Sequence, residues 1–121
     1  SINIAGRQRT RIQEIAKDIA LIGLDLDRAG RLAALESDAA LLDESLNALV
    51  SGLDDIALPP PPDHIRLKLL EVQSGWKAYK ATVDTVLANG EAGPAELYAA
   101  AAQTNPLMHR MDEAVGLYTR L

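Results

Sequence analysis

The sequence predicts an all-α protein, an antiparallel up-down-up-down four-helix bundle with a kinked last helix. Alanine and leucine dominate its 121 residues, phenylalanine is absent and β-branched residues are sparse, a composition that favours helix over sheet. Apolar residues recur at alternating spacings of three and four in four segments, which is the pattern of helix faces that pack on one another. Stretches with glycine or proline separate the segments, so each segment is expected to form one helix.

The first helix is expected to cover residues 2 to about 29 and to stop at Gly30, the usual glycine position after a helix. Its predicted inward stripe contains one charged residue, Arg9, which would point at the packing seam. The neighbouring Arg7 and Arg11 fall on other faces and reach water. The stripe consists of Ile2, Ala5, Arg9, Ile12, Ala16, Ile19, Gly23 and Leu26.

The second helix is expected to follow at once and to end near Ser51 and Gly52, where Asp54 and Asp55 begin a polar stretch. Residues 59–62 are four prolines, which have no amide hydrogen to donate and therefore cannot continue a helix. They are expected to form an extended connector, a role favoured over that of a ligand for a proline-binding partner. The apolar stripe of the second helix is Leu32, Leu35, Ala39, Leu42, Leu46, Leu49 and Leu53.

Asp63 is expected to cap the third helix, and Asn89 and Gly90 should close it. The fourth helix is expected to open at Gly93 and Pro94, because proline is permitted in the first turn. The third stripe is Ile65, Leu69, Val72, Trp76, Tyr79, Val83 and Val86, and the fourth is Leu97, Ala101, Thr104, Met108, Met111, Val115 and Tyr118.

Pro106 lies inside the predicted fourth helix. It removes the hydrogen bond to the carbonyl of Ala102, so it should kink the helix or restart it with Thr104 or Asn105 as a new cap.

Four helices with short or moderate connections give a bundle in which the first helix begins and the last helix ends at the same pole. This is the geometry expected of a domain looped out between two membrane spans. The sequence opens and stops in mid-pattern, so residues 1–121 are expected to be a single domain cut from a longer transmembrane receptor. The same topology sets Arg9 level with Met111 to Val115 on the last helix.

Composition excludes several classes of function. The net charge of −5 argues against a nucleic-acid surface, whereas the first eleven residues carry three arginines and no acid. A local basic patch on an acidic protein suits a small anion better than a polyanion. No cysteine is present for disulfide or thiol chemistry. No apolar run is long enough to cross a bilayer, and no signal peptide is visible.

An inward guanidinium at Arg9 cannot lose its proton, so it must meet an anion. No acid shares its stripe on the first helix. The anion is either a carboxylate from another helix, with Asp112 or Glu113 as the expected partner in a buried salt bridge, or a ligand that comes and goes. Spacing alone leaves these two alternatives open.

Residues that could support catalysis or bind a metal are few. His64 and His109 are the only histidines and, without cysteine, are too isolated for a metal site, so a structural or solvated role is expected for each. No nucleophile–base or paired-carboxylate arrangement follows from the spacing. The sequence therefore predicts no catalytic residue, no cofactor and no enzyme.

Two further groups of residues have structural interpretations. Trp76 and Tyr79 are expected in the core rather than in an aromatic ligand cage. Asp18, Asp25 and Asp27 are interpreted as a solvated face.

The segment Asn3-Ile4-Ala5-Gly6-Arg7-Gln8-Arg9 resembles the signature of the PilJ-type N-terminal domain of type IV pili methyl-accepting chemotaxis transducers. It is also similar to the P-box of nitrate and nitrite sensor kinases. Near the end of the chain, Asn105-Pro106-Leu107-Met108 and Met111-Asp112-Glu113-Ala114-Val115 look like the same family. The middle of the chain matches only in its helical pattern.

The resemblance implies a periplasmic four-helix sensor domain of a bacterial inner-membrane receptor, with nitrate bound between the protomers of a homodimer. By resemblance, Arg9 corresponds to the arginine that holds nitrate and Gly6 to the glycine whose backbone lies against it. Asn3 and Gln13 correspond to other motif positions. The sequence departs from the family after Arg9, where residues 10–14 read Thr-Arg-Ile-Gln-Glu in place of Met-Leu-Ser-Gln-Arg.

The expected function is therefore that of a chemoreceptor sensor domain that binds nitrate or a similar small anion, with the sensor domain of a nitrate or nitrite histidine kinase as the alternative. Two other classes stay open, a histidine phosphotransfer module and a ligand-free dimerisation bundle. The phosphotransfer module needs an exposed histidine followed by small residues, and neither His64 nor His109 has that sequence after it.

Overall fold

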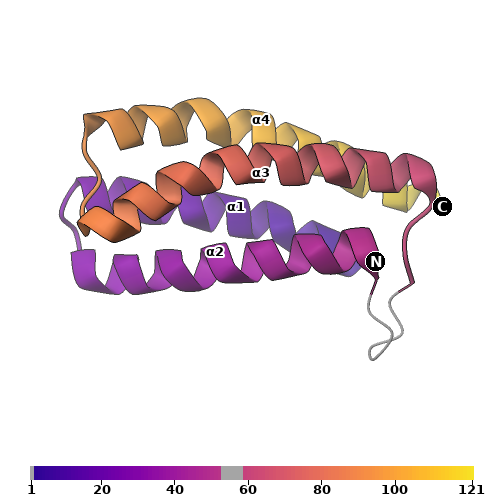
Figure 1. The fold of residues 1–121 in the computed structure, drawn as a ribbon, viewed down its shortest axis with the longest axis horizontal. Helices are drawn as coiled ribbons and strands as arrows, with labels where there is room; N and C mark the ends of the chain where they lie inside the picture. Colours follow the sequence, from indigo (N-terminus) through magenta and orange to yellow (C-terminus); the bar gives the residue numbers. More distant parts are fainter. Residues whose placement is uncertain (1, 53–58) are drawn as a thin grey trace.

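The computed structural model describes residues 2–52 and 59–121, and it confirms the predicted bundle. Its helices are α1 (Ile2–Gly23), α2 (Arg28–Ser51), α3 (Asp63–Asn89) and α4 (Pro94–Thr119). Each helix packs on its neighbours in the chain, and α1 also packs on α4, which closes the ring. The two chain ends lie at the same pole of the bundle, as expected (Figure 1).

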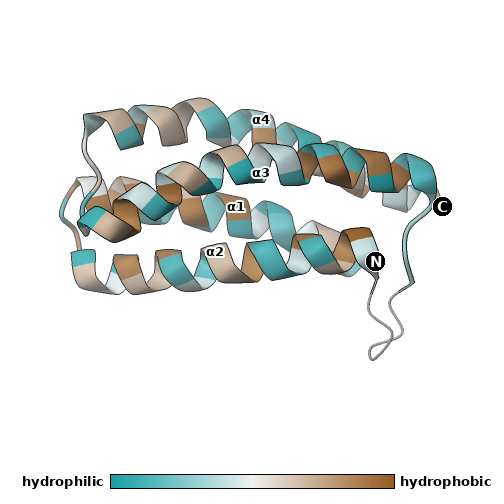
Figure 2. Ribbon diagram, in the orientation of Figure 1, coloured by the Kyte–Doolittle hydropathy of each residue, from teal (hydrophilic) through white to brown (hydrophobic). Residues whose placement is uncertain are grey.

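One hydrophobic core runs along the bundle between the four helices. Figure 2 shows hydrophobic and hydrophilic residues alternating along each ribbon, as expected for helices with one buried face. The predicted stripe of α3 is buried in full, including Trp76 and Tyr79. Trp76 Nε1 donates to Asp43 Oδ1 at 3.1 Å, and the Tyr79 hydroxyl lies 2.9 Å from Thr104 Oγ1. Both aromatic residues are therefore core residues whose polar atoms have partners, as predicted.

The predicted register of α1 is wrong at its charged position. Gln8 faces the core and is fully buried, whereas the side chain of Arg9 is 47% exposed. The observed face turns Ile15 and Ile22 inward, where the predicted stripe had smaller residues, and it therefore buries more apolar surface. The neutral amide of Gln8 is satisfied inside, because its Nε2 donates to the Ile4 carbonyl at 2.7 Å. A charged guanidinium at the same place would need a buried anion.

The first helix ends earlier than predicted, at Gly23, and Gly30 lies inside α2. Asp25 and Asp27 make the turn, with φ of 57° and 51°, a left-handed conformation that aspartate adopts more readily than most residues. Gly23 marks a close approach to α4, since a Cβ there would lie 2.7 Å from the side chain of Leu97. Turn-forming aspartates, not the later glycine, therefore set the break.

The C-terminal ends of α2 and α3 agree with the predictions, whereas the predicted N-cap of α3 is wrong. The residue after α2 is Gly52, with φ of 75°, and the residue after α3 is Gly90, with φ of 68°. Asp63 is the first residue of α3 and not its cap. The cap is Pro62, whose φ of −53° and ψ of 154° continue an extended connector. The predictions made for residues 53–55 lie outside the described residues.

The fourth helix opens as predicted and continues through Pro106, so the predicted restart is wrong. In Figure 1 the two halves of α4 point in slightly different directions, as expected for a helix with proline near its middle. Thr104 does not cap a new helix, because its hydroxyl donates to the Ala100 carbonyl at 2.6 Å. The predicted stripe is rotated from the observed one, which consists of Ala100, Leu107, Met111 and Ala114.

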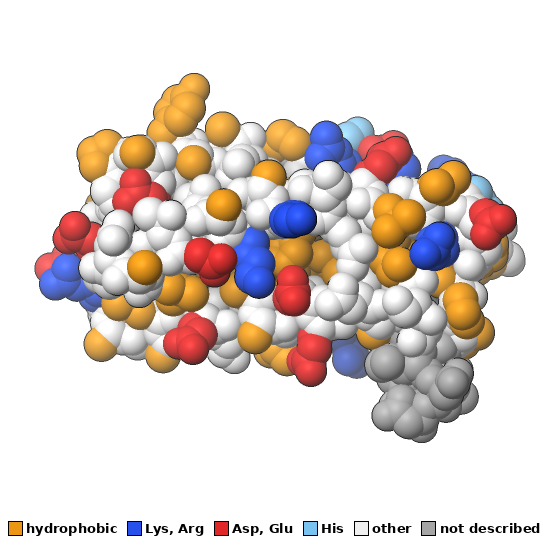
Figure 3. Space-filling model, viewed as in Figure 1, with side chains coloured by type: hydrophobic (Ala, Val, Ile, Leu, Met, Phe, Trp, Pro, Cys, Tyr) orange, Lys and Arg blue, Asp and Glu red, His pale blue; other side chains and the backbone are white. Residues whose placement is uncertain are grey.

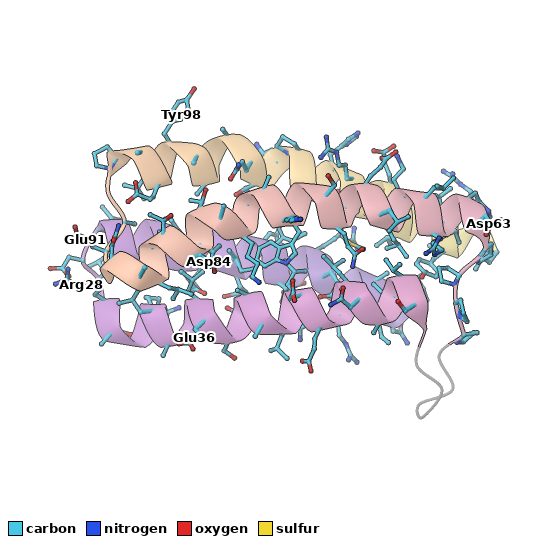
Figure 4. All side chains as sticks on the ribbon, in the orientation of Figure 1. Arg28, Glu36, Asp63, Asp84, Glu91 and Tyr98 are labelled. Carbon is cyan, nitrogen blue, oxygen red and sulfur yellow. The ribbon has the colours of Figure 1, made fainter. Side chains whose placement is uncertain are left out.

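The surface carries both signs of charge. Figure 3 shows the face formed by α2 and α3, on which acidic and basic side chains are interspersed with hydrophobic ones. At the pole away from the chain ends, Tyr98 projects from the beginning of the second turn of α4 into solvent (Figure 4). Among the described helices, none has the length and hydropathy needed to cross a membrane.

Candidate anion-binding site

Arg9 lies on the flank of α1 that faces α4. Its Nη1 donates to Asp112 Oδ1 at 3.2 Å, and both side chains are nearly half exposed. Asp112 is thus the predicted partner, but the predicted burial of the salt bridge is wrong. A solvent-exposed ion pair contributes only about 0–1 kcal/mol, because water and salt screen it. The Arg9 guanidinium is therefore open to competition from another anion.

The other predicted site residues lie on the outer surface of α1, with Gly6 and Gln13 about one turn from Arg9 and Asn3 about 120° from it around the helix. Asn3 and Gln13 are exposed, and Gly6 is partly exposed. A Cβ at Gly6 would meet no atom within 4 Å, so packing within the chain gives no reason for glycine at this position. A missing side chain is useful where a ligand or a second backbone comes close. We call these four residues, Asn3, Gly6, Arg9 and Gln13, the motif face.

The side chains of Arg7 and Arg11 project from the opposite side of α1, the side that faces α2. Residues two apart in an α-helix point roughly 160° away from each other, which separates both arginines from Arg9. Arg11 Nη1 donates to Gln8 Oε1 at 3.1 Å and to Ser45 Oγ at 3.4 Å. Arg7 is exposed, as predicted, whereas Arg11 is partly buried between the two helices.

Asp18 is a buried acid that the sequence did not predict. The side chain of Asp18 is only 1% exposed, so its interpretation as part of a solvated face is wrong. Its Oδ1 accepts a hydrogen bond from Arg31 Nη1 at 3.3 Å, and its Oδ2 has no hydrogen-bond partner. Carboxylate oxygens of Glu14, Asp18 and Asp38 all lie within 4.8 Å of one another. The three acids have the spacing of a metal site, but Arg31 already supplies a positive charge to the buried member.

The pKa of Asp18 is raised from 3.8 to about 6, chiefly by burial. A hydrogen bond between the protonated group and Asp38, and repulsion between the two carboxylates, contribute to this rise, while Arg31 opposes it. A proton on the unpartnered oxygen would let Asp18 donate to Asp38, which two ionised carboxylates cannot do.

The free energy of unfolding should fall as pH rises from about 4 to about 6, because the folded state holds the Asp18 proton more tightly than the unfolded state. We expect Asp18→Asn to remove this penalty and to stabilise the domain by on the order of 2 kcal/mol above pH 7. The same substitution should have little effect below pH 4. Urea unfolding at pH 3.5, 5 and 7.5 measures the difference. Asp84→Asn, at an exposed position on α3, is the control and should change stability by less than about 0.5 kcal/mol. Equal effects of Asp18→Asn at all three pH values would contradict the assignment.

The remaining candidates lie on the surface, as predicted. His64 and His109 are exposed, and His109 Nε2 lies 3.5 Å from Glu113 Oε1 on the same helix. Asp25 and Asp27 are also exposed, in the turn after α1.

The fold places the chain in a class, the antiparallel four-helix bundles. The chain belongs to the PilJ family, the N-terminal region of type IV pili methyl-accepting chemotaxis transducers, whose family model matches residues 1–114. It is the ligand-binding sensor domain of such a transducer and is not an enzyme. The family suggested by the sequence motif is thus confirmed.

Among solved structures, the chain is similar to the ligand-binding domain of the P. aeruginosa nitrate receptor McpN. The two share 22% sequence identity, and the match covers 99% of this chain and 94% of that chain with a TM-score of 0.80. A similarity at this identity shows that the two domains have the same fold. A search of curated proteins found no match to the chain.

Proposed function

We propose that the chain is the periplasmic sensor domain of a longer bacterial chemoreceptor and that it binds nitrate, or a similar small flat anion, between two copies of itself. One observation carries the proposal. Arg9 is accessible and, among the described residues, is bound only by a surface carboxylate, and it lies beside Gly6, where a side chain would meet open space. The name of the structural relative, a nitrate receptor, supports nitrate as the ligand.

The chemistry of nitrate suits the motif face. Nitrate is planar, and a guanidinium can donate two parallel hydrogen bonds to two of its oxygens, as it does to a carboxylate. The exposed amide of Gln13 offers neutral donors one turn from Arg9, and that of Asn3 offers them farther around the helix. Nitrate and Asp112 would compete for the same guanidinium.

A homodimer would couple binding to association. In a two-fold symmetric contact the same surface meets itself, so two α1 helices in contact would bring two Arg9 side chains together. The two guanidiniums repel each other when no anion lies between them, and one nitrate would bridge them. Gly6, without a side chain, lets the two backbones approach.

The output would be a small displacement of α1 relative to α4. The ion pair between Arg9 and Asp112 connects these two helices, and nitrate bound to Arg9 would break that ion pair. Because both chain ends lie at one pole, a sliding or rotation of α1 against α4 reaches the parts of the receptor that follow. A chemoreceptor output is favoured over a sensor-kinase output, since the matching family is the transducer type.

A thermal-shift screen of sodium salts tests the proposal. Nitrate at about a hundred times its dissociation constant should add about 2.7 kcal/mol to the free energy of unfolding. Nitrite is the nearest analogue, and chloride and sulfate at equal ionic strength control for general salt effects. The proposal fails if millimolar nitrate gives no shift, or if chloride and sulfate shift the melting temperature as much as nitrate does.

A further inference from the structure

The structure has a cavity whose lining includes none of the motif-face residues. It has a volume of about 580 Å³, within the range typical of small-molecule sites, and lies between the first half of α1 and the second half of α2. Arg7 and Arg11 line it from α1, on the flank of that helix away from Arg9. Ser45 and Asn47 line it from α2. Its position and its arginines make it distinct from the candidate nitrate site.

The described lining of this cavity carries two arginines and one acid. Within residues 2–52 and 59–121, neither Arg7 nor Arg11 forms an ion pair, and Glu44 is the single acid of the lining. Both hydrogen bonds of Arg11 use Nη1, and both go to neutral oxygens, on Gln8 and Ser45. A guanidinium has five N–H donors, so Arg11 keeps donors for a ligand.

The protein orients Arg11 toward α2. Gln8 is fully buried, and its two polar atoms are both engaged, one with the Ile4 carbonyl and one with Arg11. A buried residue with both ends hydrogen-bonded is fixed in place, and it holds the guanidinium on the cavity wall. The hydroxyl of Ser45, next to the same nitrogen, offers a ligand a second polar partner from the other helix.

The cavity also has an apolar part, formed by Ile4 and Ala48, and it is far larger than a four-atom anion needs. We propose that this cavity binds a small organic carboxylate. Its carboxylate group accepts hydrogen bonds from Arg11, with Arg7 near, and its hydrocarbon part covers Ile4 and Ala48. A carboxylate matches the guanidinium fork, and the hydrocarbon part accounts for the apolar lining. Such a ligand would join α1 to α2, whereas nitrate would act on the contact between α1 and α4.

Titration of the chain with sodium butanoate and sodium benzoate tests the proposal, with butanamide and benzamide as uncharged counterparts. Binding is followed by the NMR shifts of backbone amides. We expect both carboxylates, but neither amide, to shift the signals of residues 4–11 and 44–48 and to leave those of residues 110–116 unchanged. Arg11→Gln should weaken the binding by about tenfold or more, the loss typical of a hydrogen bond to a charged group. Ala48→Leu, which fills the apolar part and keeps both arginines, should also weaken it.

Arg9→Gln is the matched control and should leave carboxylate binding unchanged, while it removes the nitrate response. Arg7→Gln, at an exposed position, keeps the test decisive if Arg11→Gln does not fold. The proposal is overturned if the amides bind as well as the acids, if neither carboxylate shifts these signals, or if carboxylate binding is undiminished in Arg11→Gln or, should that variant not fold, in Arg7→Gln. Each of these results is compatible with nitrate binding through Arg9. The carboxylate proposal can therefore fail while the nitrate proposal stands, and the reverse also holds.

Discussion

Arg9→Ala is expected to abolish the thermal shift produced by nitrate while the bundle stays folded. The side chain makes its only described ion pair at the surface, with Asp112, so its removal should cost at most about 1 kcal/mol of stability. The loss of nitrate stabilisation is much larger, about 2.7 kcal/mol at a hundredfold excess over the dissociation constant. Thermal unfolding of both proteins with and without nitrate measures the two effects together.

Asp112→Asn separates the two accounts of Arg9. If Asp112 competes with nitrate for the guanidinium, neutralising it should tighten nitrate binding by up to about fivefold, the equivalent of a surface ion pair. If Arg9 serves only as a structural partner of Asp112, then Arg9→Ala and Asp112→Asn should each destabilise the domain slightly, and nitrate should affect neither variant nor the parent.

Gly6→Ala is expected to stabilise the isolated chain and to abolish its response to nitrate. Alanine is preferred over glycine inside a helix by roughly 0.5–1 kcal/mol, and a Cβ at this position meets nothing within the chain. In the proposed dimer the same methyl group would hold the partner helix and the anion away from the backbone. The free energy of unfolding, measured without nitrate, should rise in this variant. The increase in melting temperature that nitrate produces, measured on the same preparation, should disappear.

Gly116→Ala is the matched control for Gly6→Ala. Gly116 is also inside a helix, on α4, and a Cβ there also meets nothing within 4 Å. It should gain similar stability and keep its nitrate response. If Gly6→Ala keeps the response as well, the close approach does not occur at this face of α1.

Most of the fold follows from the sequence because the signals are local and redundant. The stripe of α3 is apolar at every position and has no competing register, so all seven predicted residues are buried. In α1 two registers compete, and the observed buried face contains two polar residues, Gln8 and Asp18. Periodicity alone could not choose between a glutamine and an arginine on the seam. Two facts decide the register. Ile15 and Ile22 are larger than Ala16 and Gly23 of the predicted stripe, and the side-chain amide of Gln8 donates to a carbonyl of its own helix.

The environment of the candidate site could not be predicted from the sequence. The four motif residues are accessible on the outer surface of α1, and the partner Asp112 follows from the bundle topology. Their burial depends on how α1 rotates about its own axis, which tertiary packing decides. Asp18 was missed for the same reason, since an acid at the edge of a stripe is solvated or buried according to that rotation. The cavity beside Arg11 arises from the pairing of α1 with α2 and has no local signature.

Sedimentation equilibrium tests most directly the central claim that nitrate joins two copies of the chain through Arg9. We predict that the dimer association constant rises with nitrate and saturates at one nitrate per two chains. In Arg9→Ala the association constant should not depend on nitrate. Identical association constants with and without nitrate in the parent chain, or one bound nitrate per chain, would contradict the account.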